Sequence, residues 1–314
     1  MTTILLCSTT TDFSRLKEML EEAAPEFDFQ LIRNAEDAQA VPADAVKGAI
    51  CWHPPHGVLK RFPQLQIVSS VAAGVDNTLA DPELPQVPVC RVIDPNLARG
   101  MAEYVAWATL YYHRRFDEVA ADRAARSWRT PVQQAAPQTR VGIMGLGVLG
   151  NTVADYLANL GFDVTGWART ARDNPAWRTY AGSDALPEFL ADRDVVVCLL
   201  PLTPLTNGIF NQQTFAAMQP GAAFINCGRG EHLVVPHLLD ALDSGHLRGA
   251  MLDVFAREPL AQDSPLWSHP KVLVTPHMAS SARFEVIVEQ VVTNLRRAFA
   301  GEAPVNAIDR TRGY

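Results

Sequence analysis

The sequence lacks the features of secreted, membrane-spanning and nucleic-acid-binding proteins. Its five cysteines are odd in number and scattered, which favours reduced thiols over a disulfide framework and predicts a cytoplasmic location. No apolar run reaches the roughly 18 residues of a spanning helix, and the first such run, Ile4–Cys7, follows no basic signal-peptide segment. The net charge of −7 argues against a basic surface for nucleic acid. We expect no membrane, nucleic-acid or metal partner.

What the sequence does contain is an alternation of short apolar runs with helical patterns along nearly its whole length. Helices are expected at 14–23, 151–160 and 237–244. Strands are expected in two series, the first at Ile4–Cys7, Phe27–Ile32, Ala49–Cys51 and Ile67–Ser70, the second at Val141–Met144, Asp163–Trp167, Val195–Leu199, Ala223–Asn226, Gly249–Asp253 and Val272–Val274. This alternation predicts an α/β fold with two doubly wound, parallel-sheet domains.

A long helical pattern lies between the two series. It runs from Met101 to about Arg126 and precedes a polar, proline-bearing loop at 131–139. Its first half, MAEYVAWATLYYH at 101–113, is apolar almost all round, which predicts burial on more than one side. A domain or subunit interface is the natural place for such a helix.

A glycine-rich turn follows the first strand of the second series. Residues 141–150, VGIMGLGVLG, place G-x-G-x-x-G between an expected strand and an expected helix. Gly145 permits a tight turn, Gly147 lets the backbone approach a pyrophosphate, and Gly150 allows the helix to pack closely on the sheet. The helix N-terminus then offers free N–H groups to phosphates. A dinucleotide is therefore expected to contact Gly145, Gly147, Val148, Leu149 and Gly150.

The next strand ends without the acidic residue that commonly binds the adenosine ribose. An Asp or Glu there accepts hydrogen bonds from the 2′-hydroxyl and would repel a 2′-phosphate. Here Ala168 removes the acceptor, Arg169 and Thr170 add a cation and a hydroxyl donor, and Arg172 is near enough to help. Arginine binds phosphate through charge-assisted, often bidentate contacts. These residues predict NADP(H) rather than NAD(H), and the alternative is a solvated surface arginine.

Three charged residues lie in loops that follow later strands. Arg229 is in INCGRG, Glu258 in LDVFAREPL and His277 in VTPHMAS. Doubly wound folds bind their ligands at such loops, at the carboxyl edge of the sheet. Taken singly, each residue has a structural alternative: a loop arginine, a capping glutamate before proline and a hydrogen-bonded loop histidine. Their common position behind a dinucleotide site favours catalysis.

These motifs resemble, in this order, those of the D-2-hydroxyacid dehydrogenase family. The family's cofactor domain carries G-x-G-x-x-G, N-x-x-R-G, D-V-F-x-x-E-P and T-P-H, all present here. The chain is closest in pattern to the glyoxylate/hydroxypyruvate reductase A type, on the pieces CWHPP, AAGVDN, MAEYV, WART, SPLW and DRTRGY. The resemblance covers nearly the whole chain. It implies NADPH-dependent reduction of small 2-oxo acids, such as glyoxylate, hydroxypyruvate or a phenylpyruvate-like acid, to D-2-hydroxy acids.

The resemblance assigns the family's catalytic Arg, Glu and His to Arg229, Glu258 and His277. The chemistry of these groups agrees with the assignment, because an arginine fork can hold a carboxylate and polarise a ketone. Histidine is a proton donor that titrates near neutrality, and a carboxylate behind the imidazole orients it and favours the imidazolium. Hydride from the nicotinamide would add to the carbonyl carbon as His277 protonates the oxygen.

The resemblance also implies a domain plan. Residues 1–97 and 281–314 are expected to form a flavodoxin-like substrate-binding domain, and residues 98–280 an NADP-binding Rossmann domain, with a cleft between them that closes on the ligands. The family is commonly dimeric through its cofactor domains. We therefore expect a homodimer with the apolar helix 101–113 at its interface.

Further ligand contacts follow from the same resemblance. Substrate is expected to contact Arg229, the backbone N–H groups at Ala73 and Gly74, Trp52 and Arg283. An aromatic residue at 52 is equally consistent with plain packing, and Arg283, early in the last helix, with a solvated cation. Cofactor is expected to contact Leu200, Pro201, Thr206, Cys227 and Asp253. For Asp253, which would meet the nicotinamide carboxamide, the alternative is a strand-end cap.

Two other functions stay open. A non-enzymatic, cofactor-sensing binding protein can have this fold, but the presence of Arg229, Glu258 and His277 together disfavours it. A phosphoglycerate-type NAD dehydrogenase is the rival enzyme, for whose regulatory domain a chain ending at Tyr314 leaves no room.

Overall fold

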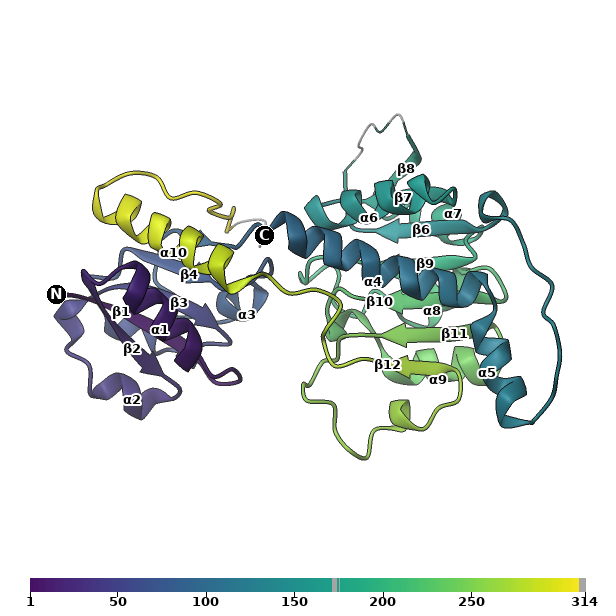
Figure 1. The fold of residues 1–314 in the computed structure, drawn as a ribbon, viewed down its shortest axis with the longest axis horizontal. Coiled ribbons are helices and arrows are strands. Elements are labelled where there is room, and N and C mark those ends of the chain that lie inside the picture. The colour runs from purple at the N-terminus through teal and green to yellow at the C-terminus, as the bar shows by residue number, and fades with distance from the viewer. Residues whose placement is uncertain (171–173, 175, 311–314) are drawn as a thin grey trace. The chain divides into compact units, whose positions relative to one another are not determined.

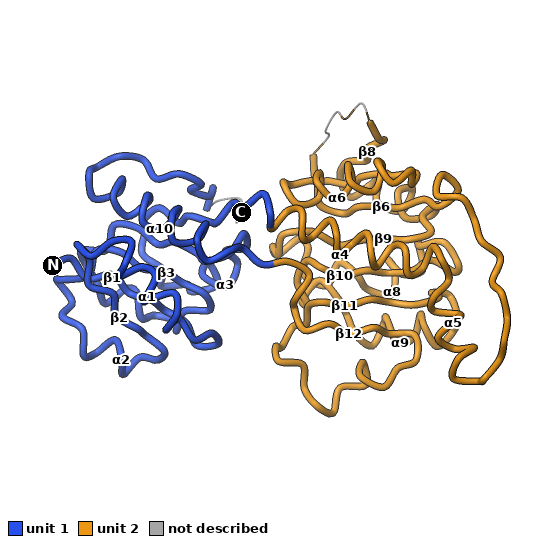
Figure 2. The backbone as a smooth tube through the Cα atoms, viewed as in Figure 1, with its two compact units in different colours: residues 1–96, 281–314 blue, residues 97–280 orange. Residues whose placement is uncertain are grey.

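The structure is a computed structural model, which describes residues 1–170, 174 and 176–310. The chain divides into two compact units (Figure 2), the first formed by Met1–Asn96 with Ser281–Tyr314 and the second by Leu97–Ser280. Each unit is built on one sheet, and all pairings between the named strands are parallel. The expected α/β class with two parallel sheets is confirmed.

The first unit has a five-stranded sheet in the flavodoxin-like order β2–β1–β3–β4–β5. Its strands are β1 (Thr2–Ser8), β2 (Phe27–Ile32), β3 (Val46–Trp52), β4 (Ile67–Ser70) and β5 (Val89–Cys90). Helices α1 (Ser14–Ala23) and α10 (Phe284–Phe299) share an apolar cluster with one face of the sheet (Figure 1). A second cluster lines the other face, where α2 (Ala35–Gln39) and α3 (Asp76–Leu79) contribute. Chain segments from both ends of the sequence thus build this unit.

The second unit has a seven-stranded sheet in the order β12–β11–β10–β9–β6–β7–β8. Its strands are β6 (Arg140–Met144), β7 (Asp163–Ala168), β8 (Arg178–Ala181), β9 (Val195–Cys198), β10 (Ala222–Asn226), β11 (Leu247–Leu252) and β12 (Val272–Val274). One face is covered by α4 (Pro95–His113) and α6 (Val148–Asn159), the other by α7 (Leu186–Leu190), α8 (Gln212–Ala217) and α9 (Val235–Asp243). Because both faces are covered, the inner strand β10 is buried throughout, and four of its five residues are apolar.

The strand order of the second sheet reverses between β6 and β9. Connections from these two neighbouring strands leave in opposite directions along the sheet, which opens a crevice for ligands at their carboxyl ends. The glycine turn follows β6 and the segment beginning at Leu199 follows β9, and both start at this edge. The topology therefore places the predicted cofactor turn where doubly wound folds bind nucleotides.

The expected helix from Met101 to about Arg126 is two helices. Helix α4 ends at His113, Arg115 adopts a left-handed φ of +59°, and α5 (Phe116–Ala124) follows. A left-handed residue breaks the helical hydrogen-bond ladder, and periodicity alone does not reveal it. Within 101–113, Met101, Val105 and Tyr112 are buried, whereas Trp107 and Leu110 are 47% and 39% exposed in the single chain.

Short elements were missed by the sequence patterns. Strands β5 and β8 are two and four residues long and lie at sheet edges, where few apolar residues mark a strand. The expected helix at 151–160 begins earlier, at Val148, because Gly147 is its N-cap.

Within the described ranges, no helix has both the length and the hydropathy needed to cross a bilayer. The same part of the chain contains no group of three or more His, Cys, Asp or Glu side chains that could hold a metal ion.

Candidate active site

The glycine turn between β6 and α6 has a geometry that requires its glycines. Gly145 has a φ of +105°, and a Cβ there would lie 2.6 Å from the Leu199 carbonyl oxygen. A Cβ on Gly150 would lie 1.8 Å from the carbonyl oxygen of Gly145, so glycine lets α6 pack onto the turn. No described atom lies within 4 Å of a Cβ built on Gly147. The backbone is therefore open to a ligand at the middle glycine.

The N-terminus of α6 is suited to binding an anion. Its N-cap, Gly147, has no side chain to cap the helix, and its first turn contains no acidic residue. The N–H groups of Val148, Leu149 and Gly150 belong to this first turn, where a helix supplies no carbonyl partners. These donors and the positive end of the helix dipole together favour a phosphate.

The end of β7 lies beside the glycine turn. The Gly145 N–H donates to the carbonyl of Trp167 at 2.9 Å, one residue before Ala168. Ala168 is buried, whereas Arg169 and Thr170 are exposed. The strand thus ends next to the helix N-terminus with a cation and a hydroxyl and without a carboxylate.

Arg172, which was expected to help at this position, lies outside the described residues. So do residues 311–314, the end of the DRTRGY segment that contributes to the family resemblance. Asp309 and Arg310 of that segment are described and belong to the first unit.

The loop after β9 is folded by its own hydroxyl groups. Thr206 Oγ1 donates to the Pro201 carbonyl at 2.7 Å and accepts the Thr203 N–H at 2.8 Å. Leu200 is buried beside it.

Cys227 directly follows β10. Burial raises the pKa of its thiol well above the ordinary value, so this side chain stays protonated. Thr206 therefore shapes the loop, and Cys227 offers an inert surface.

Two fully buried side chains fix the backbone of Arg229, which follows β10. Asn226 donates through Nδ2 to the Arg229 carbonyl at 3.0 Å and accepts the Gly228 N–H through Oδ1 at 3.1 Å. His232 accepts the Arg229 N–H through Nδ1 at 3.0 Å. The backbone N–H and carbonyl of Arg229 thus both have buried partners. The loop therefore fixes the backbone from which the Arg229 side chain extends.

The Arg229 loop packs directly on the loop that carries Glu258. A Cβ on Gly230 would lie 1.9 Å from the carbonyl carbon of Phe255 and 2.0 Å from the nitrogen of Ala256. The Phe255 N–H in turn donates to Glu258 Oε1 at 2.9 Å. Only a residue without a side chain permits this approach, which brings Arg229 near enough for its charge to act on Glu258.

Glu258 and His277 form a hydrogen-bonded ion pair. Glu258 Oε2 lies 2.7 Å from His277 Nδ1, and the two side chains are 34% and 37% exposed. Burial would raise the pKa of Glu258, but hydrogen bonds from His277 and Phe255, together with the charges of His277 and Arg229, hold it below its usual 4.5. An ionised carboxylate only accepts, so the Nδ1 atom that faces Glu258 carries a proton.

Asp253 accepts several hydrogen bonds from the loop that carries His277. His277 has a left-handed φ of +50° and its N–H donates to the Asp253 carbonyl at 2.8 Å. The buried carboxylate accepts the Thr275 hydroxyl at 2.7 Å and the N–H groups of Met278 and Ala279 at 2.9 Å each. The Asp253 carboxylate thus caps the loop that follows β12.

The small-residue loop of the first unit folds around a buried serine. Ser70 Oγ accepts the Ala72 N–H at 3.1 Å and donates to the Gly74 carbonyl at 2.9 Å. Ala73 and Gly74 themselves are half-buried. The turn after β4 is therefore held in one conformation.

The two other expected substrate residues also belong to the first unit. Trp52 is half-buried against the apolar cluster under α1 and α10, and its ring meets that of His53 edge-on at 5.1 Å. Arg283 is the N-cap of α10; its N–H donates to buried Asp94 at 3.1 Å and its side chain is 59% exposed. Arg229, Glu258, His277 and the glycine turn belong to the second unit.

Sequence reasoning missed the buried polar side chains behind these loops. Asn226 and His232 lie three residues before and after Arg229, in NCGRGEH, and their polarity at the end of a buried strand was the available signal. Tyr104 on α4 donates to Thr275 at 2.5 Å, and it does so because the Thr275 proton is already given to Asp253. No local pattern links residues 104 and 275.

Comparison with known proteins identifies the family. The family model for the D-isomer specific 2-hydroxyacid dehydrogenase, NAD binding domain, matches residues 106–279. This match covers more than half of the chain, and it spans the glycine turn as well as the loops of Arg229, Glu258 and His277.

Solved structures match over the whole length. A D-isomer specific 2-hydroxyacid dehydrogenase from Xanthobacter autotrophicus Py2, in complex with NADPH and MES, is 39% identical, with a TM-score of 0.91 over 100% of this chain and 99% of that one. An NADPH-dependent glyoxylate/hydroxypyruvate reductase from Sinorhizobium meliloti, with NADP and sulfate, is 35% identical, with a TM-score of 0.91 over 100% of both chains. A probable 2-hydroxyacid dehydrogenase from Rhizobium etli CFN 42, with NADP, HEPES and L(+)-tartaric acid, is 31% identical, with a TM-score of 0.89 over 100% and 99%. The resemblance seen in the sequence is confirmed, and the chain belongs to the D-isomer specific 2-hydroxyacid dehydrogenase family.

Proposed function

We propose that the protein uses NADPH to reduce small 2-oxo acids, such as glyoxylate or hydroxypyruvate, to D-2-hydroxy acids. The observation that carries this proposal is the 2.7 Å hydrogen bond between Glu258 and His277, beside the loop of Arg229. A cation, a carboxylate and a titratable imidazole are the groups that reduction of a 2-oxo acid requires. The Sinorhizobium relative is named for the same substrates.

Each of the three residues has a distinct role. Arg229 pairs with the substrate carboxylate and polarises the carbonyl, which suits a guanidinium held on a rigid backbone. His277, protonated on both nitrogens, donates its Nε2 proton to the carbonyl oxygen while Nδ1 stays hydrogen-bonded to Glu258. Glu258 orients the ring and favours the imidazolium. The product gains a C–H bond and an O–H bond, and His277 is left neutral.

The second unit has features that fit a bound NADPH. The uncapped N-terminus of α6 and the open backbone at Gly147 suit a pyrophosphate, and Arg169 and Thr170 suit the 2′-phosphate. When bound, NADPH supplies the hydride that reduces the carbonyl carbon. The described relatives from Xanthobacter, Sinorhizobium and Rhizobium were solved with NADPH or NADP. We also assign cofactor contacts to Gly145, Val148, Leu149, Gly150, Leu200, Pro201, Thr206, Cys227 and Asp253.

We also propose substrate contacts for residues of the first unit. The backbone N–H groups of Ala73 and Gly74, held by Ser70, are assigned to the substrate carboxylate. Trp52 is assigned to the apolar side of the substrate, and Arg283, whose side chain is 59% exposed, to a second positive charge.

A panel of 2-oxo acids assayed with NADPH and NADH tests this function. We expect turnover of glyoxylate or hydroxypyruvate and a preference for NADPH. His277→Ala should abolish turnover and leave the Kd for NADPH, measured by its fluorescence, unchanged. Undiminished reduction by that variant would refute the assigned proton donor. NADPH binding without turnover of any 2-oxo acid by the unaltered protein would instead favour a cofactor-sensing protein.

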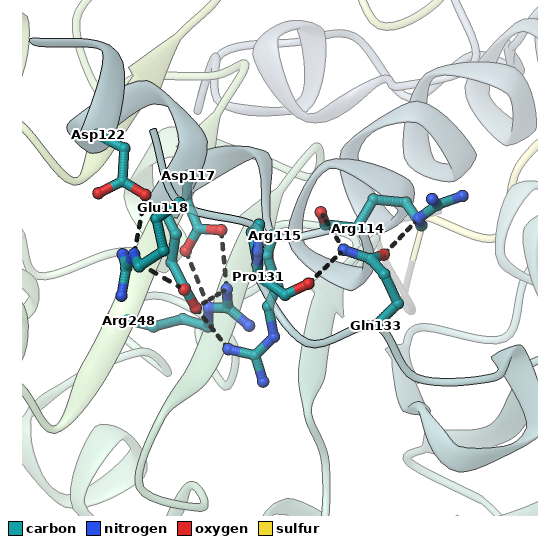
Figure 3. A network of polar contacts seen from close by, with 9 residues as sticks. Arg114, Arg115, Asp117, Glu118, Asp122, Pro131, Gln133 and Arg248 are labelled. Carbon is teal, nitrogen blue, oxygen red and sulfur yellow. Dashed lines mark hydrogen bonds and ion pairs between the residues drawn. The ribbon is translucent and has the colours of Figure 1, made fainter. Parts of the chain in front are cut away.

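We further propose that the protein is a homodimer. Its α4–α5 region exposes large apolar side chains, namely Trp107, Leu110, Phe116, Val119, Trp128 and Val132. The region is nevertheless firmly held, since Arg248 of β11 binds Asp117 of α5 through bonds of 2.9 and 2.7 Å (Figure 3). A fixed apolar surface on the cofactor-binding unit fits a second copy of this chain. Sedimentation should give a dimer, and Trp107→Glu should shift it to monomer.

The thiols fit a reducing compartment. All five cysteines are buried and none forms a disulfide. We propose the cytoplasm, where such thiols stay reduced.

A further inference from the structure

A second histidine lies behind the proposed catalytic arginine. His232 is 0% exposed and follows the Arg229 loop in the short 3₁₀ turn Gly230–His232. Its Nδ1 accepts the Arg229 N–H at 3.0 Å, and its Nε2 lies 3.3 Å from the Pro201 carbonyl. The Cys198 thiol is 3.5 Å from Nδ1. In the proposed reaction the His232 ring itself contacts neither substrate nor cofactor.

The partners of His232 define its protonation. A backbone N–H can only donate, so Nδ1 facing Arg229 must have a free lone pair. A carbonyl can only accept, so Nε2 facing Pro201 carries the proton. The ring is therefore the neutral Nε2–H tautomer. In this form the rigid ring accepts a hydrogen bond from the Arg229 N–H through Nδ1 and donates one to the Pro201 carbonyl through Nε2.

The two contacts join two different loops of the proposed site. The Pro201 carbonyl also accepts the Thr206 hydroxyl at 2.7 Å, so it is the point that folds the 200–206 loop after β9. The Arg229 N–H is the point that fixes the loop after β10. A Cβ on Gly228 would lie 2.9 Å from His232 Nδ1, so the ring packs against the backbone of the arginine loop. The His232 ring therefore bridges the two loops.

We propose that His232 is a positioning residue that couples the placement of Arg229 to the cofactor-lining loop 200–206. This inference rests on the proposed function, because it takes Arg229 as the substrate-binding cation and Pro201 as part of the cofactor site. It adds a residue that does not touch substrate or cofactor. Through Nδ1, its neutral imidazole fixes the backbone from which the Arg229 side chain extends. Through Nε2, it fixes the loop 200–206 at the Pro201 carbonyl.

Two conservative substitutions separate the two contacts. The Oδ1 atom of Asn matches the position of Nδ1 along the side chain, so His232→Asn keeps the acceptor for the Arg229 N–H and loses the donor to Pro201. Gln reaches further, so His232→Gln keeps a donor for Pro201 and loses the acceptor. His232→Leu loses both. The control is His246→Leu, since His246 Nε2 makes a comparable 2.8 Å bond to the Phe215 carbonyl away from the site.

One kinetic and one equilibrium constant report on the two loops: kcat/KM for the 2-oxo acid on the loop of Arg229, and the Kd for NADPH on the loop 200–206. We expect His232→Leu to lower kcat/KM for the 2-oxo acid by about tenfold to a hundredfold, because small displacements of a substrate-binding group have such effects, and to raise the Kd for NADPH. His232→Asn should restore most of kcat/KM but not the Kd, and His232→Gln should do the reverse. His246→Leu should change neither. Unchanged constants in His232→Leu, or no difference between the Asn and Gln variants, would overturn the coupling.

The tautomer gives a test that does not depend on turnover. Nitrogen-15 NMR of the protein labelled at histidine should show His232 protonated at Nε2 and unprotonated at Nδ1. A proton on Nδ1 would overturn the inference. If the unaltered protein reduced no 2-oxo acid, the proposed function would fail, while the tautomer and the NADPH Kd of the variants would still decide whether His232 joins the loops.

Discussion

Gly230 and Phe255 touch through their backbones, and this contact joins the loop of Arg229 to the loop of Glu258. A Cβ on Gly230 would lie 1.9 Å from the Phe255 carbonyl carbon. Arg229 immediately precedes this glycine, and the Phe255 N–H binds Glu258 at 2.9 Å. One position without a side chain therefore sets how closely the arginine approaches the Glu258–His277 pair.

Replacing Gly230 with alanine should separate these loops. The added Cβ meets backbone atoms, which cannot turn aside, so at least one loop must shift. Displacements of about 1 Å commonly reduce catalysis by roughly a hundredfold, and we expect such a fall in kcat/KM. Gly301→Ala is the control: its φ of +76° also disfavours alanine, but no described atom lies within 4 Å. It should lose stability and keep kcat/KM. A fully active Gly230→Ala variant would disprove the coupling.

Glu258→Gln should narrow the pH range of reduction. The lowered pKa of Glu258 means that its carboxylate is charged throughout the neutral range, where it favours the His277 imidazolium. The uncharged glutamine removes this attraction for the charged proton donor. The alkaline limb of kcat/KM should therefore move to lower pH. The pKa of Glu258 in the folded protein is below 4.5, so its carboxylate exerts this effect above that pH and loses it as the pH falls through the folded-state pKa. The pH profiles of Glu258→Gln and the unaltered protein should therefore converge in acid.

A second carboxylate–imidazole pair provides the control for this profile. Asp243 Oδ1 lies 3.2 Å from His269 Nε2, away from the catalytic loops. Asp243→Asn should leave the pH profile of kcat/KM unchanged. An identical profile for Glu258→Gln and the unaltered protein would show that Glu258 does not tune the proton donor.

The fold was predictable from the sequence wherever period and turn chemistry agree. Strands such as β10, in which four apolar residues are followed by one polar residue and all are buried, can be predicted directly from composition. The glycine turn was also predictable, because the turn at Gly145 and the packing at Gly150 each require glycine. The break at Arg115 was not predictable, since a single left-handed residue leaves the helical period of its neighbours intact.

The site was predictable only in part, for a physical reason. Arg229, Glu258 and His277 could be proposed because each carries a reactive or charged group and follows a strand. The residues that hold them act through contacts made by sheet order, as when Tyr104 of α4 reaches Thr275 after β12. Such pairs are distant in sequence and have no spacing rule. Sequence therefore reveals the reacting groups before the groups that position them.

Asp194→Asn should destabilise the second unit. Asp194 accepts the Arg140 N–H at 2.8 Å, two bonds of 3.2 Å from its guanidinium, and a bond from Gln219 at 2.9 Å. Burial raises the pKa of Asp194, but these bonds and the charge of Arg140 outweigh burial and lower it below 3.8. We expect a loss of about 1–3 kcal/mol in the free energy of unfolding, measured by denaturant titration at neutral pH.

The pH dependence of this loss follows from the sign of the shift. With its folded-state pKa below 3.8, Asp194 contributes stability above that pH, and the contribution is lost as the pH falls through the folded-state value. The difference between Asp194→Asn and the unaltered protein should therefore shrink in acid. Glu188→Gln is the control, because the pair of Glu188 with Arg178 is about two-thirds exposed. It should change stability by less than about 1 kcal/mol at any pH. A constant difference for Asp194→Asn would contradict the assignment.

Ala168→Asp should change the cofactor preference. Ala168 ends β7 beside the glycine turn, and an aspartate there would lie where the proposed 2′-phosphate binds. Because juxtaposed like charges cost several kcal/mol, kcat/KM with NADPH should fall at least about tenfold, whereas kcat/KM with NADH should hold or rise. The ratio of the two values, measured with one 2-oxo acid, is the readout.

Ala168→Asn separates charge from size in this experiment. Asparagine has nearly the volume of aspartate but no charge, so it should lower kcat/KM for NADPH and NADH to a similar and smaller extent. A cofactor ratio that changes equally in both variants would show that the strand end discriminates by shape. A ratio that changes only with aspartate assigns the discrimination to the phosphate charge, for which Arg169 is the adjacent cation.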